Sequence, residues 1–182
     1  MIDPRHPIGK FTYDRPYTEA ERNQLILQIE QAPAELRKAF EELPEGGLDK
    51  PYRPGGWTAR QVIHHVPESH MHSYLRFKYA MSEVEPAIKA YDEAAWAVQP
   101  DVATTDPELS LTLLEALHRR WVAFLRTLKP EDWSRTFRHP EIGVVTLDRT
   151  LGLYAWHGRH HAGHLRMIRD VSPKKLQRAS GQ

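Results

Sequence analysis

Residues 146–169 read TLDRTLGLYAWHGRHHAGHLRMIR and carry the clearest pattern of histidine and apolar residues in the chain. An α-helix turns by about 100° per residue, so residues three or four apart share a face. On that wheel His161 lies at the centre of an inward-facing stripe, within about 40° of a group of uncharged residues. This group is Leu147, Thr150, Tyr154, Leu165 and Ile168. The stretch therefore predicts an amphipathic helix with histidine on its buried face.

Two pairs of histidines four residues apart in this helix could each chelate a metal ion: His157 with His161, and His160 with His164. Residues four apart are close enough for both imidazoles to reach one ion. The wheel favours the first pair, because His157 lies about 40° from His161 whereas His160 lies about 100° away. The spacing is that of the zincin pair, but Gly158 stands where a zincin carries its glutamate, so the zincin base is missing.

A third ligand is expected from a second group of histidines in the helix predicted over 58–82. This group is His64, His65, His70 and His72. His65 and His72 both lie nearer the core-facing edge than His64, and the wheel alone does not choose between them. Pro67 lacks an N–H and crowds the preceding turn, so we expect a bend there that could re-aim His65 or disturb the site.

Two further helices complete the expected fold. A capping box opens one over 18–43, and Pro33 should kink or split it. An N-cap aspartate followed by proline opens the other over 106–128, which carries a heptad-like apolar stripe. The four helices predict an all-α four-helix bundle, with a long crossover over 83–105 between the second and third helices.

The helices are expected to form a single domain over 1–170 that starts with a proline-rich arm at 1–17. Residues 133–146 give a weak hairpin signal around Gly143. The polar segment 171–182 is predicted to be a disordered tail.

Composition excludes several classes of function. The chain has 182 residues and a formal net charge of +1, so neither nucleic acid nor an anionic membrane is expected as a partner. Its apolar runs are too short to span a bilayer and its N-terminus has no apolar signal core, so we expect a cytoplasmic protein. Cysteine is absent, so any metal site must use nitrogen and oxygen ligands.

The chain resembles the YfiT-like branch of the DinB superfamily in WTARQVIHHVPESHMHSYLRFK, YDEAAW, HRRWVAFLRTL and GLYAWHGRHHAGHL. The likeness runs from about Pro7 to about Ile168. It implies a DinB-type four-helix bundle with a long crossover, and one divalent ion per chain, zinc or nickel, held by three histidines. The family's ligands fall on His65, His157 and His161, which include the pair that the wheel favours. The resemblance also implies a cytoplasmic homodimer.

The chain departs from the family pattern beside the first of these ligands. Where the family reads HHLADSH, this chain reads HHVPESH over 64–70, with Pro67 in place of a good helix former and Glu68 in place of aspartate. Glu68 lies one turn from His65, where it could carry protons during catalysis. It could equally orient a histidine or face the solvent.

Three functions are compatible with this site. The resemblance implies a metal-dependent hydrolase, in which zinc lowers the pKa of its bound water to about 7. A metal-dependent thiol S-transferase is the alternative, since relatives transfer bacillithiol, mycothiol or glutathione to electrophiles, and a metal deprotonates a bound thiol. The substrate would be a small molecule in either case, joined by a low-molecular-weight thiol in the second. The third hypothesis is a non-catalytic metal-binding stress protein, whose site would be closed to water.

Overall fold

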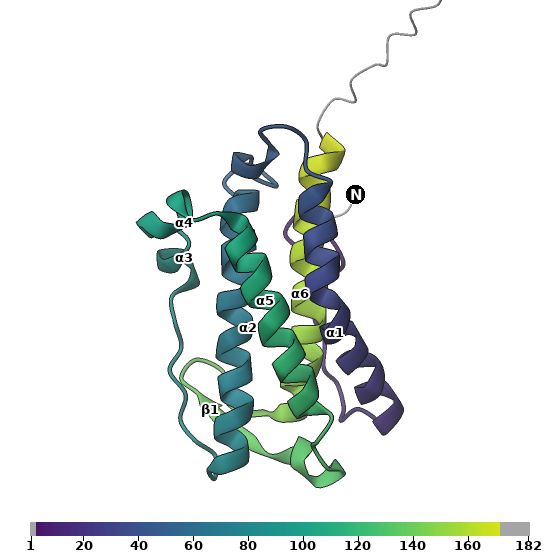
Figure 1. Cartoon of the computed structure of the whole chain (residues 1–182). Helices are drawn as coiled ribbons and strands as arrows, with labels where there is room; N and C mark the ends of the chain where they lie inside the picture. Colours follow the sequence, from purple (N-terminus) through teal and green to yellow (C-terminus); the bar gives the residue numbers. More distant parts are fainter. Residues whose placement is uncertain (1–2, 172–182) are drawn as a thin grey trace, which may run out of the picture.

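Four long helices form the bundle in the computed structural model, which describes residues 3–171 (Figure 1). They are α1 (Glu19–Glu41), α2 (Ala59–Ser82), α5 (Pro107–Leu125) and α6 (Leu147–Val171). α1 packs against α5 and α6, and α2 packs against the same two helices. The predicted all-α four-helix bundle is therefore confirmed. None of the helices in the described part of the chain is long and apolar enough to cross a membrane.

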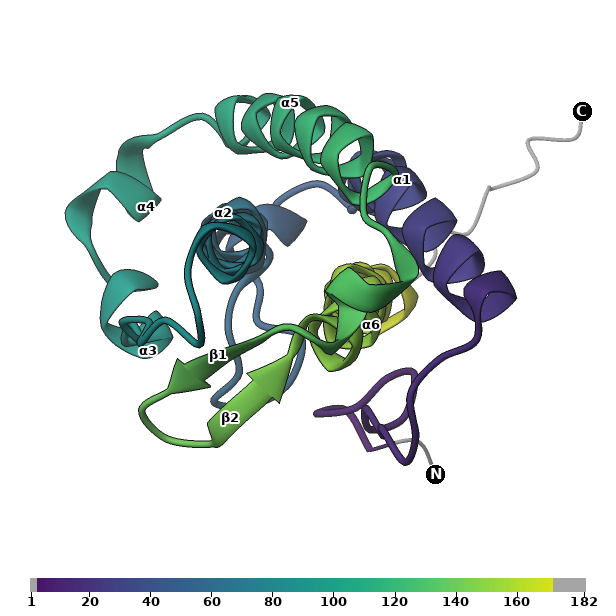
Figure 2. The ribbon, with the colours of Figure 1, turned by 90° about the horizontal axis from the view of Figure 1, so that it is seen from below.

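The predicted crossover runs outside α2 (Figure 2). It contains two short helices, α3 (Glu93–Trp96) and α4 (Pro100–Thr104), which the sequence did not indicate. The weak hairpin signal is confirmed by antiparallel strands β1 (Thr136–His139) and β2 (Gly143–Thr146). Gly143 begins β2 with φ 74°, a left-handed conformation that glycine adopts without strain. Short 3-10 turns, η1 (Gly47–Asp49) and η2 (Pro130–Ser134), lie in the remaining connections.

The helix boundaries follow from local chemistry. The predicted capping boxes are present at Thr18 and Thr58, and the Asp106 side chain accepts a hydrogen bond from the first turn of α5. The expectation that Pro33 could split the first helix is wrong, because α1 continues through it. The loss of one helical hydrogen bond is compensated there, since the carbonyl left without a partner accepts one from another helix. α2 likewise continues through Pro67.

Two apolar clusters fill the interior at different levels of the bundle. One is built around Trp121 and Phe77, and the other around Leu114 and Leu165. Each long helix contributes to both clusters, with a break between its two contributions. Buried histidines occupy these breaks, namely His70 in α2, His118 in α5 and His161 in α6. The core therefore contains a polar histidine layer between two apolar clusters.

The N-terminal arm is attached to α6 through one buried carboxylate. Asp148, 2% exposed, accepts hydrogen bonds from the Tyr13 hydroxyl at 2.9 Å and the Tyr17 backbone N–H at 2.8 Å. It also pairs with the Arg22 Nε of α1 at 2.6 Å. Gly152 makes room for the arm, since a Cβ at this position would lie 2.2 Å from the Tyr17 hydroxyl oxygen. The arm is thus held between α1 and α6.

Asp148→Ala should lower the free energy of unfolding by about 3–5 kcal/mol, because it leaves a largely buried guanidinium without its partner. Asp49→Ala is the matched control. It removes the acid of an ion pair with Arg60 in which the Asp49 side chain is 69% exposed, and should cost at most about 1 kcal/mol. Urea unfolding followed by circular dichroism measures both. Equal losses in the two variants would contradict the role given to Asp148.

Candidate metal centre

Three histidines from two helices converge on one point. His65 of α2 places its Nε2 atom 3.4 Å from the Nε2 atom of His157, and the Nε2 atom of His161 lies 3.2 Å from the same atom. One ligand atom from each ring lies within 4.8 Å of the others. Two imidazole nitrogens bound to a tetrahedral zinc ion at 2.0–2.1 Å would be about 3.3 Å apart. The arrangement therefore fits a metal ion without rearrangement of the helices.

Burial favours the neutral form of these imidazoles. Burial lowers the pKa of His65 to about 4, with the nearby His160 as a smaller cause. Burial also lowers the pKa values of His157 and His161 well below the ordinary value for histidine, and neighbouring histidines add to the effect. A neutral imidazole offers a lone pair, so the rings are ready to bind a cation at neutral pH.

The structure resolves the alternatives that the helical wheel left open. The His72 ring stacks on Tyr91, with 4.3 Å between ring centroids, and does not join the triad. The His164 ring stacks on Tyr52 at 3.8 Å. His160 lines the wall of the neighbouring pocket. Within residues 3–171 the triad includes no fourth histidine or acidic residue, so the histidines brought together are those expected from the wheel and the resemblance.

Glu68 lies apart from the pocket beside the triad. It is half-buried in α2, and burial together with the negative charge of Asp101 raises its pKa. It is not one of the residues that line the pocket. Its part as a proton carrier stays a prediction.

A cavity of about 370 Å³ opens directly on the three histidines. Its other lining residues include Trp57, Ser69, Arg76, Tyr91, Tyr154 and Trp156. Structural zinc sites usually have four protein ligands, whereas catalytic sites have three and leave a position open. The triad with its adjoining cavity has the arrangement of a catalytic site.

Polar groups continue from the triad along this cavity. The Tyr154 hydroxyl, about two turns of α6 from His161, lies 3.4 Å from the Ser69 hydroxyl and 3.5 Å from a guanidinium nitrogen of Arg76. The Nε atom of Arg76 is buried without a hydrogen-bond partner. No acid of the described chain forms an ion pair with Arg76, although Glu93 and Glu141 also line the cavity. The cavity thus offers an unpaired positive charge to a ligand.

Sequence reasoning missed the part played by His70, which contacts the triad from behind. Its Nε2 atom lies 3.0 Å from Nδ1 of His157, the ring nitrogen that does not face the triad. A signal was present in the helical pattern, because His70 shares the buried stripe of α2 with Val66, Ser73 and Phe77. Its hydrogen-bond partners could not be read from the sequence, since they come from other helices.

The fold and the site define a four-helix bundle protein with a histidine triad at the mouth of a cavity. The family model of the DinB superfamily matches residues 28–165, and the chain belongs to this superfamily. The solved structure of YfiT from Bacillus subtilis is similar, with a TM-score of 0.88 and 43% sequence identity. The match covers 92% of this chain and 96% of that one. YfiT is described as a probable metal-dependent hydrolase with an unusual four-helix bundle topology.

Curated relatives agree with this comparison. Proteins of Bacillus cereus (strain 03BB102) and Bacillus thuringiensis subsp. konkukian (strain 97-27) are 52% identical over 169 residues. The alignment covers 93% of this chain and 97% of each relative. Both carry the name "Putative metal-dependent hydrolase".

The purified protein is expected to contain about one zinc or nickel ion per chain, measured by elemental mass spectrometry. His161→Ala should abolish metal binding, because only two imidazoles would remain to hold the ion. His160→Ala is the matched control, a neighbouring buried histidine outside the triad, and should keep the metal. A wild-type protein that contains no metal and takes up none on reconstitution would contradict the site.

The metal-free protein should lose stability as pH falls from about 6.5 to about 4. In the unfolded chain histidines take up protons near pH 6.5, whereas burial lowers the pKa values of His65, His118 and His160 to about 4 in the folded chain. The unfolded state therefore binds more protons across this window, and acidification favours it. Urea unfolding midpoints measured at pH values across the window test this expectation. Equal midpoints at every pH would contradict the neutral histidine layer.

Proposed function

We propose that the chain is a metal-dependent hydrolase of a small molecule, with one divalent ion, zinc or nickel, at His65, His157 and His161. The observation that carries the proposal is the convergence of three Nε2 atoms at the mouth of a cavity. A divalent ion held by three neutral imidazoles supplies a Lewis acid with a position open to water or substrate. Dimerisation and a cytoplasmic location, which the resemblance implies, remain part of the proposal.

Aromatic residues hold the ligands in place and restrict access by water. The Trp57 ring meets His65 edge-on at a centroid distance of 4.7 Å and lies parallel to His161 at 6.5 Å. Such contacts limit the orientations open to the imidazoles. A shielded site also strengthens the electrostatic interactions within it.

Arg76 suits an anionic group of the substrate. A guanidinium offers a fork of donors that matches a carboxylate, and the buried Nε atom of Arg76 has no partner to displace. The hydroxyl of Tyr154 lies 3.5 Å from a guanidinium nitrogen of Arg76, and the Tyr154 ring lies next to that of His157, with 5.5 Å between centroids. From there the hydroxyl can donate to charge that develops during the reaction. Burial raises the pKa of the Tyr91 hydroxyl in the same cavity, so this group stays protonated and can also donate. We therefore expect a substrate whose scissile bond and carboxylate lie at opposite ends of the cavity.

The zinc-loaded protein should hydrolyse mono-p-nitrophenyl adipate, which carries a carboxylate, in preference to neutral p-nitrophenyl butyrate. Arg76→Gln should lower kcat/KM for the adipate ester about 10–100-fold, in line with a hydrogen bond to a charged group, and leave the butyrate ester unchanged. The control is Arg120→Gln, an exposed arginine of α5, which should change neither rate.

Hydrolysis that survives removal of the metal by a chelator would contradict the proposed function. Turnover of an electrophile that requires added low-molecular-weight thiol would identify the thiol transferase instead. Tight metal binding without turnover of either kind would favour the non-catalytic hypothesis.

A further inference from the structure

A chain of hydrogen-bonded imidazoles leads from the triad into the core. Nδ1 of His157 lies 3.0 Å from Nε2 of His70, and Nδ1 of His70 lies 2.7 Å from Nε2 of His118. Nδ1 of His118 lies 2.6 Å from the backbone carbonyl oxygen of Ile29. The chain connects α6, α2, α5 and α1 in that order. It uses both ring nitrogens of His70 and of His118.

The two inner rings of the chain are buried and are held by their neighbours. His70 is 0% exposed and His118 is 1% exposed. The two rings stack with 4.9 Å between centroids, and Trp121 meets both of them edge-on at 6.0 and 5.7 Å. Because polar groups buried in this way require hydrogen-bond partners, each inner ring nitrogen depends on its neighbour in the chain.

The carbonyl at the end of the chain determines the position of every proton. A carbonyl oxygen only accepts, so Nδ1 of His118 must carry a hydrogen. A neutral imidazole has a single N–H, so Nε2 of His118 accepts from Nδ1 of His70, and Nε2 of His70 accepts from Nδ1 of His157. Nε2 of His157 is then left with a lone pair, and this is the atom that lies 3.4 Å from His65 and 3.2 Å from His161.

Neutral rings are required for this outcome. A charged imidazolium has two N–H donors. One such ring in the chain would reverse the direction of the hydrogen bonds between it and His157, and Nε2 of His157 would then carry a hydrogen. Complete burial penalises the charged form. It lowers the pKa of His118 to about 4.

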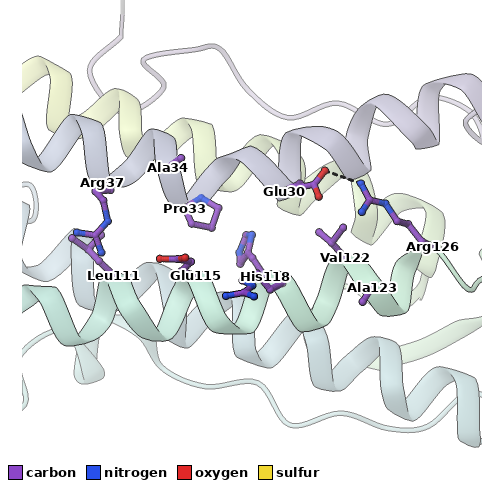
Figure 3. A pocket seen from close by; sticks show the side chains of 11 residues that line it. Glu30, Pro33, Ala34, Arg37, Leu111, Glu115, His118, Val122, Ala123 and Arg126 are labelled. Atoms are coloured by element: carbon purple, nitrogen blue, oxygen red, sulfur yellow. Dashed lines mark hydrogen bonds and ion pairs between the residues drawn. The ribbon is translucent and has the colours of Figure 1, made fainter.

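Pro33 supplies the free carbonyl. In an α-helix the carbonyl of Ile29 would accept from the N–H of the residue four positions later, but this residue is Pro33 and has no N–H. The oxygen is therefore free to accept from another helix. Figure 3 shows Pro33 next to His118 where α1 and α5 form a pocket of about 510 Å³. A residue expected to disturb the helix instead provides the end point of the chain.

We propose that Pro33, the Ile29 carbonyl, His118 and His70 are positioning groups that hold His157 in its Nδ1–H form, with its Nε2 lone pair directed at the metal. The inference rests on the proposed metal site. Hydrogen bonds from metal-ligating histidines to such partners fix the ring and raise its basicity, and loss of the partner usually weakens metal binding about 10–100-fold. None of these groups touches the substrate cavity.

The first test compares two substitutions at one position. His118→Phe fills a similar volume but can neither accept from His70 nor donate to Ile29, so zinc affinity should fall about 10–100-fold. His118→Gln can do both, through its amide oxygen and nitrogen, and should bind zinc almost as tightly as wild type. Competition with a chromophoric chelator measures the affinity of variants shown to be folded by circular dichroism.

The matched control is His64→Phe. It removes a buried imidazole next to His65 whose Nδ1 lies 2.7 Å from the Ser110 hydroxyl, outside the chain. Its zinc affinity should equal that of wild type. Equal affinities of His118→Phe and His118→Gln would overturn the proposal, as would an equal loss in His64→Phe.

A second test needs no variant. In the ¹⁵N-histidine-labelled, zinc-loaded wild type, nitrogen chemical shifts should show a protonated Nδ1 on His157, His70 and His118. A protonated Nε2 on His70 or His118 would overturn the proposal even if zinc binds. If wild type binds no zinc, the proposed function fails, while the same spectrum of the metal-free protein still decides the tautomers of His70 and His118.

Discussion

The structure depends on one constraint, which is that the buried imidazoles of His70 and His118 need hydrogen-bond partners in a layer that lies between two apolar clusters. An unsatisfied buried donor or acceptor lowers the free energy of unfolding by about 1–3 kcal/mol. The helices must therefore pack so that the hydrogen-bond partners of His70 and His118 are in place. Each long helix supplies one part, and α1 supplies only a backbone oxygen. The layer therefore sets how the four helices align along their axes, a choice that apolar packing alone leaves less defined.

The two sides of the histidine layer differ in their surroundings. Toward α2 and α6 the triad of imidazoles borders a cavity that Tyr154 and Arg76 also line. Toward α1 and α5 a row of ring nitrogens at hydrogen-bonding distances ends at the Ile29 carbonyl. A site built in this way keeps one side open for chemistry while the opposite side holds the ligands rigid. This division matches the requirement that a catalytic site be supported by well-packed surrounding groups.

Sequence reasoning went furthest where a single helix carries the information. The helices, their capping boxes and the inward pair His157 and His161 follow from periodicities of three and four residues, because these are set by the backbone of one helix. His65 required the family resemblance, since the wheel also allowed His72. The prediction that Pro33 could split the helix was wrong, because the rule for proline considers only its own helix. Its compensation comes from His118, far away in the sequence.

The sequence alone was sufficient to predict an all-α bundle, a metal site restricted to nitrogen and oxygen ligands, and the pair His157 and His161 within it. These depend on local geometry and on the absence of cysteine. The tertiary structure showed which histidines converge in the triad and which lie behind it, and that within residues 3–171 the Nε atom of Arg76 is buried without a hydrogen-bond partner. An imidazole has two ring nitrogens, and its two neutral tautomers differ little in free energy compared with a buried hydrogen bond. Its role is set by whichever group lies opposite each nitrogen, and those groups come from other helices.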